Sequence, residues 1–310
     1  MKARKTLYAD DIAHVYQRSI QGDVIFYDFR DMLVFFTILS VASIKHHVTI
    51  VAICIMLNHD HILLEAPSQK DISMFMAEVN SKFAIEYNKD CPGYGKVFEP
   101  VFKQSNKFGD KNKRNVIAYC YNNYVEKKAV VRAEDVRWNF LAFASSDHPF
   151  SGKLVVRRAS NAMKKVLNEV RYFHGKGMPV TYRLLDKWMA MISAGPDPRK
   201  EKAQLIDCII ATYNVINYAD TIKYYKSLDS MILAINSNTG SDYEVGEEIE
   251  KDSYKGFRVM MTSLLRDYGL ARPKLVLRLP EEERRKIGWD FMKRRLGSKY
   301  QIERLLHIEP

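Results

Sequence analysis

The sequence predicts an α+β protein, with a ferredoxin-like antiparallel sheet and its helices in the first half and an all-α region in the second. Two observations support this fold class. Segments with strand and helix periodicity alternate in the order β-α-β-β-α-β over about the first 106 residues, which is the order of a ferredoxin-like sheet. From about residue 156 to residue 310 the patterns are almost only helical.

The first half owes its predicted elements to the spacing of its apolar residues. The strand pair at its centre is apolar and rich in β-branched residues, and Cys91-Pro92-Gly93 ends the second helix. In chain order the predictions are a strand at 12–20, an amphipathic helix at 29–45, strands at 48–58 and 61–66, a helix from Pro67 to about Lys89, a strand at 96–106 and a helix from Asp110.

In the second half, glycines and capping residues mark where helices begin and end. Gly175 and Gly177 end its first helix, Thr181 can cap the next, and Asp197-Pro198 is a cap followed by proline at the first helical position. Residues 236–256 are polar and acidic and are expected to form an exposed loop. Residues 280–308 suggest a partial helix-turn-helix that reads DNA, or else a plain packing helix.

Bulk composition bounds the class of protein. The net charge of +11 and the pI of about 9.3 favour a polyanionic partner such as nucleic acid, without separating DNA from RNA or from an acidic membrane. The four cysteines never form Cys-x-x-Cys, which argues against a zinc ribbon or a disulfide framework and fits a reducing cytoplasm. The longest apolar segment, near residues 48–57, is too short to span a bilayer. We therefore expect a cytoplasmic, bacterial protein with no membrane partner, associated with the nucleoid when it binds DNA.

A polar sequence, Asn58-His59-Asp60-His61, interrupts the apolar strand pair. Because residues i and i+2 of a strand point to the same face, His59 and His61 are expected to project together. Two adjacent imidazoles on a rigid strand are suitable ligands for a divalent metal. The alternative is a turn between two strands, with one histidine packed and the other solvated.

The helix that begins at Asp110 carries three tyrosines. At about 100° per residue, Tyr121 and Tyr124 fall on its apolar face. Tyr119 and Asn123 lie an i, i+4 step apart on the neighbouring polar edge, with Glu126 close by. Tyr119 is thus the tyrosine with an amide one turn beyond it, although it can also be an ordinary half-buried aromatic residue.

Taken in order, these segments resemble the single-tyrosine HUH transposases of small insertion sequences, in particular the REP-associated tyrosine transposases. The resemblance covers about residues 10–145, and its most specific parts are the His-x-His pair and the tyrosine helix. Leu57, Asp60 and Tyr124 depart from the family, which usually has proline, a hydrophobic residue and proline at these positions. The other matching segments are His14–Ser19, Val24–Tyr27, Gly95–Phe98 and Phe102–Ser105.

The resemblance implies a role for each residue of the site. It makes Tyr119 the nucleophile, and His59, His61 and Asn123 the ligands of a divalent metal. Neutral imidazoles and an amide oxygen suit Mg²⁺ or Mn²⁺, and zinc is allowed by the ligand types alone. A phenol has an ordinary pKa near 10, so it needs assistance from the metal or a base to act as a nucleophile.

Basic residues surround the start of the tyrosine helix. Cations beside a phosphate-cleaving site can hold a nucleic-acid backbone, and a solvated basic edge is the alternative. The candidate DNA contacts are Lys103, Lys107, Lys111, Lys113 and Arg114.

The resemblance also implies a domain organisation. Residues 1–135 would be an HUH single-tyrosine transposase-like domain, residues 136–155 a connecting segment and residues 156–310 a helical accessory domain. The helical region has no His/Asp/Glu cluster with ligand spacing, so we expect it to contribute substrate or partner contacts.

The function predicted from the sequence is a metal-dependent transposase or strand transferase. It would cleave and rejoin single-stranded DNA, with a hairpin nearby, through a 5′-phosphotyrosine. Two alternatives remain: a non-catalytic DNA-binding regulator on the same fold, and a hydrolytic metal-dependent nuclease that needs the histidines but not Tyr119. The sequence leaves open a homodimer.

Overall fold

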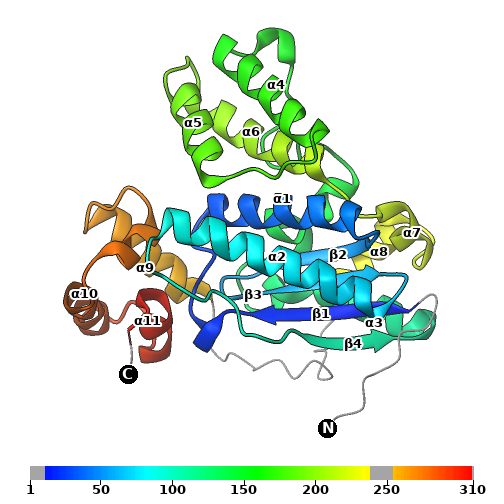
Figure 1. Cartoon of the computed structure of the whole chain (residues 1–310), viewed down its shortest axis with the longest axis horizontal. Helices are drawn as coiled ribbons and strands as arrows, with labels where there is room; N and C mark the ends of the chain where they lie inside the picture. Colours follow the sequence, from blue (N-terminus) through cyan, green and yellow to red (C-terminus); the bar gives the residue numbers. More distant parts are fainter. Residues whose placement is uncertain (1–10, 238–253, 309–310) are drawn as a thin grey trace.

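A computed structural model describes residues 11–237 and 254–308, and Figure 1 shows how their elements are arranged. Four strands form one antiparallel sheet in the order β2-β3-β1-β4, so β3 and β1 are interior. The predicted α+β class and the ferredoxin-like order of elements are confirmed. The strands are β1 (Ile12–Arg18), β2 (Thr49–Ile55), β3 (His59–Glu65) and β4 (Lys103–Lys107).

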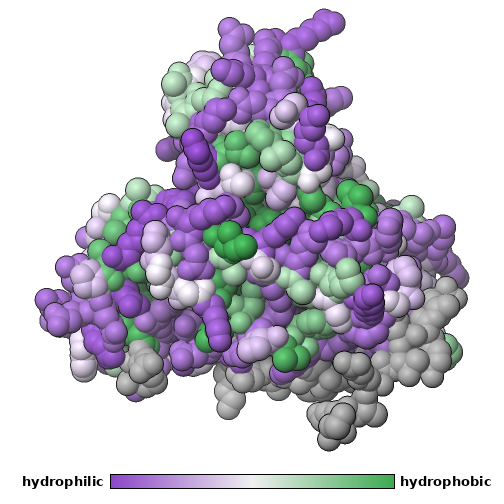
Figure 2. Space-filling view, viewed as in Figure 1, coloured by the Kyte–Doolittle hydropathy of each residue, from purple (hydrophilic) through white to green (hydrophobic). Residues whose placement is uncertain are grey.

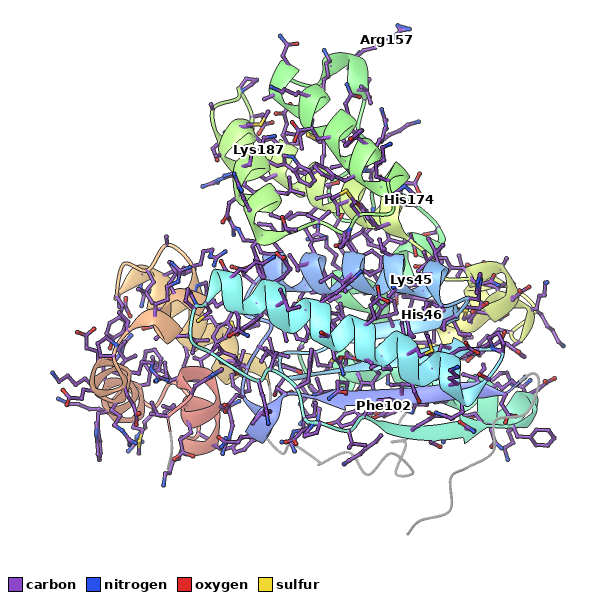
Figure 3. The ribbon with its side chains drawn as sticks, in the orientation of Figure 1. Lys45, His46, Phe102, Arg157, His174 and Lys187 are labelled. Carbon is purple, nitrogen blue, oxygen red and sulfur yellow. The ribbon has the colours of Figure 1, made fainter. Side chains whose placement is uncertain are left out.

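Helices cover both faces of the sheet. Helices α1 (Phe29–Lys45) and α2 (Gln69–Asp90) pack on one face, and α3 (Gly109–Glu126) packs on the other. Glu78, in the middle of α2, joins this helix to the C-terminal end of α1: Glu78 Oε2 lies 2.6 Å from Lys45 Nζ and 2.7 Å from His46 Nε2. Figure 3 labels Lys45 and His46 at that end of α1.

Helix α1 is buried on all sides over residues 31–40, which corrects the expectation of an amphipathic helix at 29–45. Residues 31–40 are all buried. Their outer side is covered by α4 (Asn161–Gly175), α5 (Tyr182–Ser193) and α6 (Pro198–Tyr213), the layer above α1 in Figure 1. A helix that is apolar all round is normally a buried one. Figure 2 shows a mostly hydrophilic face on which apolar residues gather where this layer meets the rest of the protein.

The remaining helices form a second hydrophobic core with α3 and the opposite face of the sheet. They are α7 (Tyr218–Lys223), α8 (Leu228–Asn236), α9 (Tyr254–Arg266), α10 (Glu281–Lys293) and α11 (Lys299–Leu306). Short 3₁₀ segments at 20–22, 133–135, 137–139, 141–144, 156–158 and 273–278 connect the helices and strands. Both cores contain residues from before and after positions 135 and 155, and the domain boundaries at these positions stay a prediction.

Local signals placed most element ends correctly. Thr181 and Asp197 cap α5 and α6 as expected, their side chains accepting from the backbone N–H groups of Leu184 and Lys200. The predicted strand at 96–106 is wrong over residues 96–102, where one isolated bridge joins Phe98 to Ser19. Pro100 has no N–H for a ladder, which explains the late start of β4. Most of the polar loop expected at 236–256 lies outside the described residues, but α9 already begins at Tyr254.

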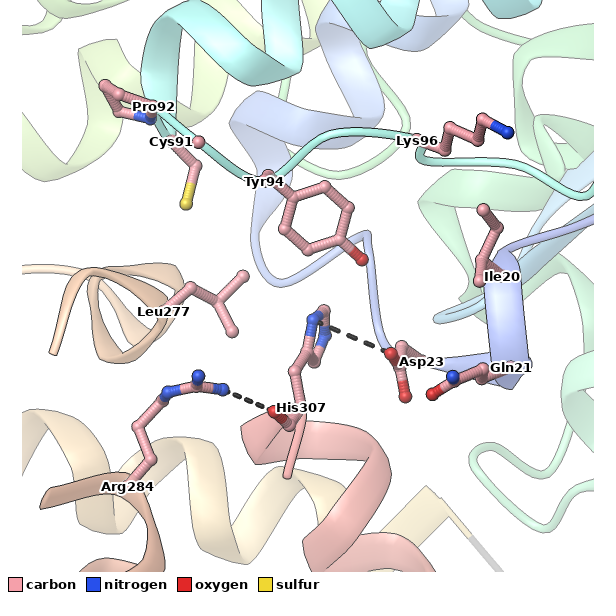
Figure 4. A pocket seen from close by; sticks show the side chains of 11 residues that line it. Ile20, Gln21, Asp23, Cys91, Pro92, Tyr94, Lys96, Leu277, Arg284 and His307 are labelled. Atoms are coloured by element: carbon pink, nitrogen blue, oxygen red, sulfur yellow. Dashed lines mark hydrogen bonds and ion pairs between the residues drawn. The ribbon is translucent and has the colours of Figure 1, made fainter. Parts of the chain in front are cut away.

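Helix α11 packs against the segment that links β1 to α1. The hydroxyl of Tyr27 donates to the carbonyl of Leu305 (2.5 Å), and the N–H of Val24 donates to the carbonyl of Arg304 (3.0 Å). Just beyond the helix, His307 lies between Tyr94 and Asp23 at the wall of a cavity of about 330 Å³ (Figure 4). These contacts give α11 a packing role, and DNA reading by residues 280–308 stays a prediction.

A buried cluster of charges ties the late helices to the first ones. The ammonium of Lys274 lies 2.8 Å from Asp31 Oδ1 and 3.0 Å from Asp90 Oδ2, and its side chain is 2% exposed. It also lies over the ring of Tyr87, 3.5 Å from the centroid. Arg272 donates two hydrogen bonds to Asp90. Burial opposes ionisation of Asp90, but these two cations outweigh it and lower the pKa of Asp90.

No helix among the described residues is both long and apolar enough to cross a membrane.

We predict that Lys274→Met lowers the free energy of unfolding by about 3–5 kcal/mol, because it leaves buried carboxylates without their cation. Chemical denaturation followed by circular dichroism measures the loss. Lys223→Met is the matched control, since Lys223 pairs with Asp220 in solvent and should change stability far less. Equal losses in the two variants would contradict the role given to Lys274.

Candidate active site

The two histidines of the polar sequence lie on the same face of interior strand β3. Both side chains are buried, and their ring centroids are 5.1 Å apart with the planes at 85°. The face is the one covered by α3, because Leu63, two residues on, belongs to the core that α3 shares. The alternative of a turn with one solvated histidine is therefore wrong.

Hydrogen bonds fix the tautomer of His59. Asn58 Nδ2 donates to the carbonyl of Gly22 (2.9 Å), so Asn58 Oδ1 faces the histidine and lies 2.7 Å from His59 Nδ1. An amide oxygen only accepts, so Nδ1 of His59 carries the proton. The lone pair is then on Nε2, which is the arrangement that a metal-ligating histidine needs.

His61 is held by a third histidine that the sequence reasoning did not single out. His14 Nε2 on β1 lies 2.9 Å from His61 Nδ1, and the two ring centroids are 5.2 Å apart. When His61 Nδ1 is the donor, Nε2 of His61 keeps its lone pair as in His59. The signal was present in the sequence, because His14 and Tyr16 share a strand face at i, i+2, and Tyr16 contacts both histidines of β3.

Burial keeps both histidines of β3 neutral. It lowers the pKa of His59 well below 6.5, and the nearby charges of Lys127 and Arg18 lower it further. The pKa of His61 is lowered first by burial and then by His59, His14 and Lys127. Neutral imidazoles are able to donate their lone pairs at and below physiological pH.

Helix α3 places Tyr119 against this pair. The ring of Tyr119 meets that of His61 edge-on, with centroids 5.5 Å apart, and lies 5.8 Å from that of His14. Tyr119 is 3% exposed, so the polar edge of α3 on which the helical wheel placed it is buried here. The burial of this edge comes from the sheet, which a wheel of one helix does not include.

The other two tyrosines of α3 are held away from the histidines. The hydroxyl of Tyr124 donates to the carbonyl of Ile55 (2.5 Å), and its ring stacks on that of Tyr254. Tyr121 is fully buried in the core, and its hydroxyl has no hydrogen-bond partner within the described ranges. Burial raises the pKa of both phenols well above 10.

Asn123 lies one turn beyond Tyr119. Its Nδ2 donates to the carbonyl of Tyr119 (3.0 Å), which turns Oδ1 away from that carbonyl. Oδ1 is buried and has no hydrogen-bond partner among residues 11–237 and 254–308. Glu126, three residues further, has its pKa raised by burial.

The donor set fits a hard divalent cation. His59 Nε2, His61 Nε2 and Asn123 Oδ1 would be the ligands, and a buried amide oxygen without a hydrogen bond is an atom that a cation would satisfy. The described residues contain no group of three or more His, Cys, Asp or Glu arranged to hold a metal.

Asp60, between the two histidines, points to the opposite face of the sheet. It is fully buried, and burial raises its pKa well above 3.8, which favours the neutral carboxyl group. Because it points to the other face, this departure from the family pattern adds no ligand beside the imidazoles.

Two of the five predicted DNA contacts are buried. Lys103 and Lys111 are exposed and Arg114 is partly exposed, whereas Lys107 and Lys113 are buried. The ammonium of Lys113 lies 3.4 Å from the hydroxyl of Tyr224, which is only partly buried. The DNA-binding role of these five residues stays a prediction.

Comparison with known proteins finds a similarity for part of the chain. Residues 24–127, or 104 of the 310 residues, match the family described as "Transposase IS200 like". A solved structure described as a REP-associated tyrosine transposase bound to a REP hairpin is similar over 44% of this chain and 81% of its own, with 17% identity and a TM-score of 0.38. No curated protein matches the chain.

The segment that matches the IS200-like transposase family contains the histidines of β3, Tyr119 and Asn123, so the candidate site lies within the part of the chain that is similar to this family.

Proposed function

We propose that the protein is a single-tyrosine transposase that cleaves and rejoins single-stranded DNA through a 5′-phosphotyrosine. The observation that carries the proposal is the contact between Tyr119 and His61, which brings a phenol from α3 to two neutral imidazoles on β3. The match of residues 24–127 to the IS200-like transposase family supports a DNA transposase, and the net charge of +11 suits a polyanionic substrate.

The proposed step exchanges one phosphodiester for another. The oxygen of Tyr119 attacks the phosphorus, a Tyr–O–P bond forms, and the P–O3′ bond breaks. The 3′ oxygen leaves as a hydroxyl and takes up a proton, while the phenolic proton passes to solvent. Because the energy of the diester is retained, a 3′-hydroxyl can later attack the phosphotyrosine and rejoin the strand without ATP.

The residues of this chain prepare the step by position and charge. A bound Mg²⁺ or Mn²⁺ would stabilise negative charge on the phosphoryl oxygens as a Lewis acid, held by His59, His61 and Asn123. Asn58 and His14 hold the imidazoles in place through their Nδ1 atoms. Tyr121 and Tyr124 are packed away from the histidines and do not compete as nucleophiles.

Tyr119→Phe removes only the hydroxyl, so we predict a folded protein that forms no covalent adduct. Incubation with a labelled single-stranded oligonucleotide and Mn²⁺, followed by a denaturing gel, measures the adduct. Tyr121→Phe and Tyr124→Phe are the matched controls and should retain it, since these tyrosines lie in the core. Cleavage at a normal rate by Tyr119→Phe, with His59→Ala inactive, would establish the hydrolytic nuclease instead. Binding without any cleavage by the unmodified protein would establish the non-catalytic regulator.

Asn58→Ala should weaken Mn²⁺ binding by about 10- to 100-fold, the usual effect of losing the hydrogen bond that orients a ligating histidine. Titration calorimetry with Mn²⁺ measures the affinity. Asn139→Ala is the control for loss of a buried asparagine, because Asn139 bonds to backbone carbonyls of Tyr121 and Ala133 away from the histidines. An unchanged affinity in Asn58→Ala would show that His59 is not a metal ligand.

A further inference from the structure

A basic groove of about 540 Å³ lies between the end of α3 and the helices α9 and α10. We call it the α9 groove and define it by its basic residues. They are Lys128, Lys255, Arg258, Arg266 and Arg294. The matched family segment ends at residue 127, so every residue of the groove lies outside it.

Three of the five cations are available to a ligand. Arg266 and Arg294 form ion pairs with Asp267, and Arg294 also pairs with Asp290. Lys128, Lys255 and Arg258 are exposed, and their charged groups form no ion pair or hydrogen bond within the described part of the chain. Among residues 11–237 and 254–308, the groove therefore carries positive charge that no ion pair neutralises at these three side chains.

The cations of α9 form one stripe. Lys255, Arg258 and Arg266 lie at i, i+3 and i+11, with the hydroxyl-bearing Thr262 at i+7, so they share one face of the helix. At 1.5 Å per residue, this stripe is roughly 16 Å long. With about 3.4 Å per nucleotide along a stacked strand, it matches roughly five nucleotides.

The stripe begins beside the candidate active site. The backbone N–H of Tyr254, the first residue of α9, donates to the carbonyl of Lys127 (3.4 Å), just after α3. Its ring stacks on Tyr124, and its hydroxyl accepts from the N–H of Leu57 (3.4 Å), which directly precedes the Asn-His-Asp-His sequence. One residue of α9 is thus attached to both elements that carry the proposed metal ligands and nucleophile.

We propose that the α9 groove binds the sugar–phosphate backbone of the single-stranded DNA that continues from the active site. The proposal rests on the proposed function for the nature of the ligand. The unpaired cations, their linear spacing and the attachment of α9 to α3 and to the β2–β3 turn support a backbone contact that is independent of sequence.

The test is the salt dependence of DNA binding. The groove variant is Lys128→Gln/Lys255→Gln/Arg258→Gln, placed in full-length protein that also carries Tyr119→Phe to prevent cleavage. Fluorescence anisotropy with labelled single-stranded DNA gives the affinity at several NaCl concentrations. Each lost phosphate contact lowers the slope of log K against log[salt] by about 0.7, so loss of three should lower it by about 2.

The control variant removes the same charge elsewhere. Lys153→Gln/Arg157→Gln/Arg158→Gln changes three exposed cations near Arg157, at the far end of the α4–α6 layer (Figure 3). Its salt slope should equal that of the parent protein. A second readout is strand length: the loss in the groove variant should be absent with strands too short to reach α9 and appear after an extension of roughly five nucleotides.

The outcomes separate this inference from the proposed function. If the salt slope of the groove variant is unchanged while Tyr119 still forms the adduct in the unmodified protein, DNA binding by the α9 groove is wrong and the proposed function stands. The occupant of the groove would then be an acidic protein surface. A lowered slope would support the groove even if the Tyr119 experiment excluded the covalent step. Equal losses in the groove and control variants would show a general charge effect and overturn the proposal.

Discussion

The contact between Lys274 and Asp31 is the constraint on which the arrangement of the whole chain depends. Asp31 belongs to the first turn of α1, and its Oδ2 accepts from the backbone N–H groups of Tyr27 and Asp28. Its Oδ1 accepts from Lys274 (2.8 Å) and from the hydroxyl of Tyr182 (2.7 Å) on α5. One buried carboxylate thus caps α1 and fastens to it both the α4–α6 layer and the segment that precedes α10. Charges buried this deeply persist only when all of them are paired, so the cluster favours one relative placement of these layers.

This arrangement makes the sheet a rigid platform for the candidate site. β3 is interior, α1 and α2 fill one side of the sheet, and α3 is pressed onto the other by α8, α9 and α11. His59, His61 and Tyr119 therefore lie on elements packed from both sides, and the supporting bonds of Asn58 and His14 hold the imidazoles before any ligand arrives. A site built on such elements loses little conformational entropy when it binds substrate.

Local chemistry made much of the fold predictable, and contacts between distant residues explain what was missed. Periodicity and side-chain type predicted the bounds of α1, the caps at Thr181 and Asp197, and the order of strands and helices along the chain. The late start of β4 follows from Pro100, whose missing N–H interrupts strand pairing and is visible in the sequence.

His14 was missed because its contact with His61 depends on how β1 pairs with β3. The burial of Tyr119 and the pairing of Lys274 with Asp31, 243 positions away, depend on tertiary packing, which no local pattern contains.

The sharing of both cores between early and late segments has a consequence for folding during synthesis. Residues of α11 complete the core that α3 begins, and α4–α6 cover the outer side of α1. Helices α4–α6 end at Tyr213, so the outer side of α1 gains its cover once they have been added, whereas α11 ends at Leu306, 306 − 126 = 180 residues after the end of α3. At about 5–20 residues per second, those 180 residues take roughly 10–35 s, and for that time α3 lacks the cover that α11 provides. We therefore expect the docking of α11 to follow the pairing of the strands during synthesis.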